Sequence, residues 1–174
     1  GPQLVTFMSG CVAARIDSPS FWAGLTRLRD VYGIEGPQLV TFMSGCVAAR
    51  IDSASFWAGL TRLRDEYGIE GPHLVTFMSG CVASRFDSET FWDGLARLKD
   101  VYGIEGPQLV KFMCNGVAAR LDEPSFWDGL TRLRCEYGIK GPHLVAFMCG
   151  GVAARLDSAS FWAGLTRLRD EYGI

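Results

Sequence analysis

The first 35 residues contain two stretches in which apolar side chains recur at steps of three and four residues. Between the two stretches lies the polar pair Asp17-Ser18, followed by Pro19. Steps of three and four match the 3.6-residue turn of an α-helix, so the pattern predicts two helices joined by a short turn. The apolar positions are Leu4, Val5, Phe7, Met8, Cys11, Val12 and Ile16, and then Phe21, Trp22, Leu25, Leu28 and Tyr32.

Residues that begin and end helices stand at the edges of both stretches. Gly1-Pro2 is a helix start, because a proline in the first turn loses no hydrogen bond. Asp17-Ser18 offers a capping oxygen to the second helix, with Pro19 in its first turn. Gly33 suits the left-handed residue that follows a helix, and Ile34 can then fold back onto the helix. We therefore predict helices of about thirteen and about fifteen residues.

The two-helix pattern occurs five times along the 174 residues, at intervals of 35. Such self-similarity is typical of an array in which each unit stacks on its copies. We therefore expect an all-α protein: an α-solenoid, a right-handed superhelix of two-helix repeats, that forms a single array over residues 1–174. The predicted repeats are 1–35, 36–70, 71–105, 106–140 and 141–174.

Gly24 and its counterparts lie in the middle of the second predicted helix in every unit. A glycine at such a position costs about 1 kcal/mol relative to alanine. Its presence in all five units predicts that another helix, or a ring such as Trp22, packs closely over it.

A stripe of mostly polar or small residues remains on the first predicted helix, and the units differ along it. In a solenoid of helix pairs, one set of helices usually lines the concave face, so the stripe is a candidate ligand-binding surface. The alternative explanation is that small residues vary freely at positions where they contribute little to packing. The stripe consists of Gln3, Thr6, Gly10, Gln38, Thr41, Gly45, His73, Thr76, Gly80, Gln108, Lys111, Asn115, His143, Ala146 and Gly150.

One arginine per unit recurs at the end of the first predicted helix. There it complements the helix dipole and can pair with the aspartate that follows it in sequence, as Arg15 with Asp17. The alternative is a ladder of candidate phosphate contacts along a nucleic-acid backbone. These arginines are Arg15, Arg50, Arg85, Arg120 and Arg155.

The charge balance argues against a nonspecific nucleic-acid binder. Lysine and arginine number 17 against 19 acidic residues, which gives a net charge of −2, whereas such binders show a basic excess. A local basic groove is still possible, because the net charge does not show how the charged side chains are distributed over the surface. The longest apolar run, around Leu4 to Ala14, is shorter than the roughly 20 residues of a membrane span, and no signal peptide is recognisable. We expect an intracellular protein without a membrane partner.

Residues for catalysis or metal binding are sparse. The six cysteines form no C-x-x-C pair, and equivalent positions in stacked helices lie about 8–10 Å apart, too far for a disulfide. Free buried thiols in a reducing compartment fit better. The only histidines, His73 and His143, are two units apart, and no phosphate-binding loop, dinucleotide fingerprint or serine-hydrolase elbow occurs. We expect no metal, no cofactor, no small-molecule substrate and no enzymatic activity.

The junction GIEGPQLVTF at residues 33–42 resembles the pentatricopeptide repeat, whose helix pairs also recur every 35 residues. RID at 15–17 is similar to that family's G-R-[IL]-D. The resemblance implies a superhelix that binds single-stranded RNA, one base per repeat. One reading position would fall on Gln3, Gln38, His73, Gln108 and His143; the other would fall on Met8 and its copies.

The triplets Cys114-Asn115-Gly116 and Cys149-Gly150-Gly151 resemble the base-reading segment of TAL-effector repeats. Two-helix repeats that read one base each would bind RNA or DNA. The near-identity of the units also fits an engineered or consensus array without a natural ligand.

We expect a non-catalytic repeat scaffold that binds a protein or peptide, or itself, through a concave first-helix face and uncapped ends. Both end units are in register with the internal ones, so their apolar faces would favour end-to-end self-association. Modular nucleic-acid recognition is the alternative.

Overall fold

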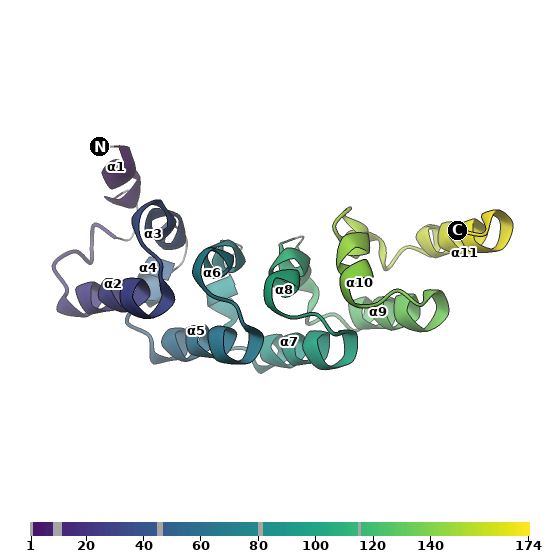
Figure 1. Cartoon of the computed structure of the whole chain (residues 1–174), viewed down its shortest axis with the longest axis horizontal. Helices are drawn as coiled ribbons and strands as arrows, with labels where there is room; N and C mark the ends of the chain where they lie inside the picture. The colour runs from purple at the N-terminus through teal and green to yellow at the C-terminus, as the bar shows by residue number, and fades with distance from the viewer. Residues whose placement is uncertain (1, 9–11, 45–46, 80–81, 115) are drawn as a thin grey trace.

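The computed structural model describes residues 2–8, 12–44, 47–79, 82–114 and 116–174. Over these ranges the ordered secondary structure is entirely helical, with no strand, so the all-α prediction is confirmed (Figure 1).

Three kinds of helical segment alternate along the chain. The short helices are α1 (Pro2–Met8), α3 (Gly36–Met43), α6 (Gly71–Met78), α8 (Gly106–Met113) and α10 (Gly141–Met148). The long helices are α2 (Pro19–Tyr32), α5 (Ala54–Tyr67), α7 (Glu89–Tyr102), α9 (Pro124–Tyr137) and α11 (Ala159–Tyr172). Between short and long helices lie single turns: α4 (Val47–Arg50) and the 3-10 turns η1 (Val82–Arg85), η2 (Val117–Arg120) and η3 (Val152–Arg155).

The first predicted helix is wrong in length. The α-helix ends at the invariant methionine of each unit, as α8 does at Met113, and a separate turn follows. Gly116 and Gly151 both have a φ of 75°. That left-handed conformation cannot continue a right-handed helix, so the segment predicted as one helix divides into two.

The bounds of the long helices agree with the sequence, but the predicted side-chain cap does not form in α2, where Ser18 makes no capping hydrogen bond; the equivalent Ser88 of α7 and Ser158 of α11 do accept one. α2 begins at Pro19 and ends at Tyr32, and Gly33 follows it in the left-handed conformation with a φ of 66°. The backbone N–H of Ile34 donates to the carbonyl of Leu28 at 3.0 Å, which satisfies an otherwise unpaired group at the helix end. The predicted left-handed stop at Gly33, with the chain folding back, is therefore confirmed.

The helices lie in two rows, as Figure 1 shows. Each short helix packs against the next: α1 on α3, α3 on α6, α6 on α8 and α8 on α10. The long helices form the second row. Both rows bow in this view, and the short helices lie on the inner side of the bow. Fully buried phenylalanines, such as Phe56 and Phe91, belong to the apolar core of these rows.

The glycine in the middle of α2, α5, α7 and α9 is packed from the following repeat. A Cβ atom on Gly24 would lie 2.5 Å from Ile51 Cγ1, and one on Gly94 would lie 3.2 Å from Leu121 Cβ. On Gly59 it would overlap the ring of Phe86. The predicted close packing is confirmed for the glycines of α2, α5, α7 and α9, where the packing group comes from the turn that precedes the next long helix; it is wrong for Gly164 in α11, which faces open space.

Replacing Gly59 by alanine should lower the free energy of unfolding by about 1–2 kcal/mol, because overlap with Phe86 outweighs the gain in helix propensity. The matched change Gly164→Ala meets open space in α11 and should raise that free energy by about 0.5–1 kcal/mol. Urea unfolding followed by circular dichroism at low protein concentration measures both. Equal effects of the two changes would contradict the packing explanation.

Candidate binding surfaces

The predicted stripe lies along the row of short helices and is open to solvent. Gly10, Gly45, Gly80 and Asn115 lie outside the described residues; of the others, only Gln38 is partly buried. The hydroxyls of Thr41 and Thr76 donate to carbonyls one turn earlier in their own helices, at 3.1 and 3.0 Å. The described stripe residues therefore form an exposed surface, which we call the short-helix surface.

A depression of about 480 Å³ opens on this surface between the third and fourth repeats. Its apolar lining includes Phe77, Val82 and Met113, all nearly fully buried. Thr76 and Arg85 are among its polar lining residues. Sequence analysis had singled out Thr76 and Arg85, and had included Met113 and Cys114 through the family resemblances. It missed Phe77 and Val82 as lining residues, because apolar residues that line a cavity follow the same helical period as the core.

The recurring arginines connect successive repeats. The distance from Arg50 Nη1 to Asp87 Oδ2 is 2.7 Å, and that from Arg85 Nη1 to Asp122 Oδ2 is 2.9 Å. Each arginine thus pairs with the aspartate of the next repeat and not with the one that follows it in sequence. The pairs are Arg15–Asp52, Arg50–Asp87, Arg85–Asp122 and Arg120–Asp157. Arg155 is exposed and forms no ion pair within the described residues.

Hydrogen bonds lower the pKa of the carboxyl groups of Asp87, Asp122 and Asp157. Thr90 donates to Asp122 at 2.6 Å, and together with Arg85 it lowers the pKa of that carboxyl group below its ordinary value. Arg120, and then Ser125, likewise lower the pKa of Asp157. The junctions are therefore most stable when the aspartates carry their charge.

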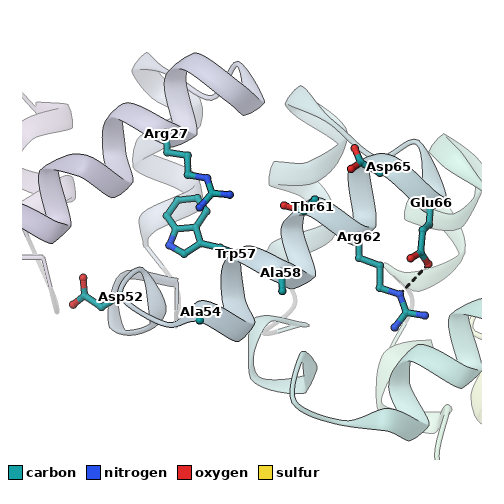
Figure 2. A pocket seen from close by; sticks show the side chains of 9 residues that line it. All are labelled: Arg27, Asp52, Ala54, Trp57, Ala58, Thr61, Arg62, Asp65 and Glu66. Carbon is teal, nitrogen blue, oxygen red and sulfur yellow. Dashed lines mark hydrogen bonds and ion pairs between the residues drawn. The ribbon is translucent and has the colours of Figure 1, made fainter.

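The long helices carry a second surface, drawn in Figure 2. The guanidinium of Arg27 lies 4.6 Å from the ring centre of Trp57 in the next repeat, within cation–π distance. Beside this pair is a depression of about 780 Å³, in which Arg62 Nε donates to Glu66 at 2.9 Å. The sequence analysis did not identify this arginine–tryptophan pair, although both residues recur in every unit.

The charged groups around that depression already have partners. Asp52 pairs with Arg15, Asp65 with Arg64 at 2.7 Å, and Glu66 with Arg62. The arrangement recurs in the last repeat, where Arg132 lies 4.5 Å from the ring centre of Trp162. We interpret the long-helix surface as part of the joint between repeats.

The cysteines differ from the expectation of buried thiols. Cys114, Cys135 and Cys149 are free and exposed, so that prediction is wrong for them. Cys114 and Cys149 directly follow the ends of α8 and α10 and so lie in the exposed turns, and Cys135 lies on the exposed side of α9. Cys11, Cys46 and Cys81 lie outside the described residues.

Neither a metal site nor a membrane span is found over the same part of the chain. There, no three histidine, cysteine or acidic side chains come together as a metal site would require. No described helix combines the length and apolar character of a membrane span.

Comparison of the chain with protein-family models, with curated proteins and with solved structures found no match in any of the three. The functional argument therefore depends on the surfaces described above.

The free energy of unfolding should fall as the pH is lowered from about 5 to about 2. Each aspartate with a lowered pKa binds a proton more readily in the unfolded state than in the folded state, so acid favours unfolding. The stabilisation is complete above the unfolded pKa and is lost as the pH falls through the folded pKa. Asp122→Asn should make the melting temperature depend less on pH, measured by circular dichroism. Asp93→Asn, at an exposed aspartate without an ion pair in the described chain, should leave the pH dependence unchanged.

Arg120→Ala should lower the free energy of unfolding by about 1–2 kcal/mol, since charged hydrogen bonds to the next repeat are lost. The Arg120 side chain is only 15% exposed and donates to Asp157, Glu123 and the carbonyl of Ala153. Arg155→Ala removes the same side chain where it has no such partners and should change stability by less than about 0.5 kcal/mol. Urea unfolding compares the two, and similar losses would refute a junction role for the arginines.

Proposed function

We propose that the chain is an α-solenoid of five two-helix repeats and acts as a non-catalytic scaffold that binds a protein or peptide on its short-helix surface. One observation carries the proposal: residues of this surface vary between repeats and are exposed, whereas the arginine, aspartate, glycine and tryptophan of the junctions are the same in every repeat. The inner position of the short helices in Figure 1 supports a concave binding face.

The depression between the third and fourth repeats is the best-formed place for a peptide side chain. Its lining of Phe77, Val82 and Met113 offers apolar contact, and Thr76 and Arg85 offer polar contact. An apolar pocket with a few polar groups is the usual form of an anchoring site. We infer that one apolar side chain of a bound peptide enters here.

The ion pairs that the recurring arginines already form favour a protein or peptide ligand over a nucleic-acid backbone. Four of the five recurring arginines pair with aspartates, and a phosphate would have to displace those partners. The net charge of −2 adds no long-range attraction for a polyanion.

A random peptide library displayed on phage, selected on the immobilised chain, tests the proposal. The best peptide should lose at least about tenfold in affinity with Thr76→Arg, which places a long charged side chain at the depression. Val101→Arg, the same gain of charge on the exposed side of α7, should change affinity by no more than about twofold. Failure to enrich any peptide, or equal effects of the two variants, would refute the proposal.

Recognition of one base per repeat is the second candidate function. The observation that favours it is the position of the variable triplets: Cys114, Gly116 and Cys149 to Gly151 are exposed where the chain leaves a short helix. One such turn per repeat would suit base reading, with Lys111 on the same surface.

Fluorescence anisotropy with random single-stranded RNA, single-stranded DNA and duplex DNA, at low and near-physiological salt, tests this candidate. A base reader should bind with a steep salt dependence. Arg120→Ala should then weaken binding to all sequences, whereas Asn115→Gly should change the preferred sequence. Absence of binding at low salt would eliminate the candidate.

A further inference from the structure

Arg120 shows that a single arginine at a junction between repeats can bind two carboxylates at once. It pairs with Asp157 of the next repeat and also with Glu123 of its own repeat, where Nη2 and Oε2 are 2.8 Å apart. The guanidinium group allows this because its N–H donors point in several directions. With both carboxylates in place, the Arg120 side chain is 15% exposed.

Arg85 has only one of these two partners. Its Nη1 lies 2.9 Å from Oδ2 of Asp122, which is its single ion-pair partner in the ranges that the structure describes. The reason lies in the sequence, because Ser88 stands where the next repeat has Glu123. The Arg85 side chain is 30% exposed, so it keeps N–H donors for a second carboxylate.

Arg85 also lines the depression of about 480 Å³ between the third and fourth repeats. The apolar side chains of Phe77, Val82 and Met113 line the same depression. A carboxylate that reaches Arg85 there is partly shielded from water, which strengthens its attraction to the guanidinium. The site therefore suits a ligand in which an apolar group and a carboxylate lie close together.

Asp122 does not need to leave for such a carboxylate to bind. The hydroxyl of Thr90 donates to Asp122 at 2.6 Å, so this carboxylate does not depend on Arg85 alone. Arg120 already holds Asp157 together with Glu123. One ligand carboxylate can share Arg85 in the same way, whereas a phosphate backbone would need the arginines of several repeats.

The position of the depression indicates where the carboxylate belongs on a peptide. The depression lies between the third and fourth repeats, and the row of short helices continues past it to α3 on one side and α10 on the other (Figure 1). A peptide on this surface can run past the depression in both directions. The carboxylate then belongs to a side chain and not to the end of the peptide.

We propose that the peptide bound on the short-helix surface carries an aspartate or glutamate directly beside its apolar anchor, and that Arg85 binds this acidic side chain. The acidic residue takes the place at Arg85 that Glu123 takes at Arg120. The inference rests on the proposed peptide-binding function and adds to it the chemistry of the ligand.

Selection of the phage-displayed random library on the parent chain and on Arg85→Met, side by side, tests the inference. The parent should enrich peptides in which an acidic residue neighbours an apolar one, and Arg85→Met should enrich apolar peptides without that preference. Arg50→Met is the matched control, since Arg50 also has a single aspartate partner, at 2.7 Å, but does not line the depression. It should keep the acidic preference.

The selection separates the two ways of failing. Peptides enriched by the parent without an acidic neighbour would overturn this inference and leave the peptide-binding function standing. No enriched peptide at all would overturn the function itself.

Fluorescence anisotropy with the best enriched peptide measures the contribution of Arg85. The peptide is synthesised with blocked ends, in its acidic form and with the acidic residue changed to the matching amide. The parent should bind the acidic form at least about fivefold more tightly, and Arg85→Met should bind both forms within about twofold of each other. An equal loss with both forms would show a structural role only, and binding that needs a free C-terminal carboxylate would overturn the side-chain assignment.

Ser88→Glu tests the same site with Arg85 in place. The new carboxylate should occupy Arg85 as Glu123 occupies Arg120, and should weaken the acidic form at least about threefold but not the amide form. Ser158→Glu is the control, because Ser88 and Ser158 both accept a capping hydrogen bond at 3.4 Å and only Ser88 lies near the depression. An unchanged affinity of Ser88→Glu for the acidic form would overturn the inference.

Discussion

The close approach of consecutive repeats at the glycine of each long helix is the constraint on which the structure depends. With a hydrogen in place of a side chain at Gly24, Gly59 and Gly94, an apolar group of the following repeat reaches the helix backbone. Tyrosine, tryptophan and arginine side chains then meet around that point. A repeat by itself would leave these groups in water, so its neighbour completes it.

In the described chain, charged side chains act mainly through ion pairs between neighbouring units. Four of the five recurring arginines, Arg15, Arg50, Arg85 and Arg120, are neutralised by aspartates of the next unit, and hydrogen bonds from residues such as Thr90 fix the carboxylates. These pairs are partly exposed, so each adds little free energy by itself, but together they set the register between units. These pairs join the turns and long helices, whereas the described residues of the short-helix surface are mostly exposed.

Much of the local structure could be predicted from the sequence. The helical period, Pro19 and Gly33 locate the long helices, because helix ends depend on nearby residues. The division of the first predicted helix could not be predicted, since glycine is tolerated within helices and only the fold shows that Gly116 is left-handed. The exposure of Cys114 follows from that division.

The candidate site was predictable only in part. Exposed stripe residues such as His73 and Thr76 were identified by their variation, which needs no knowledge of tertiary contacts. The partners of Arg50 and Arg27 lie in the next repeat, about one unit away in sequence. Such pairings depend on how the units stack, and neither helical period nor composition contains that information.

The separation of the invariant junction from the variable short-helix surface has a consequence for how such a chain can change. A unit exchanged for another keeps the partners that its neighbours require, because the glycine, tryptophan and arginine positions are common to all five units. The order of the units can then be rearranged like interchangeable cassettes, and each new order displays a different series of side chains on the same framework.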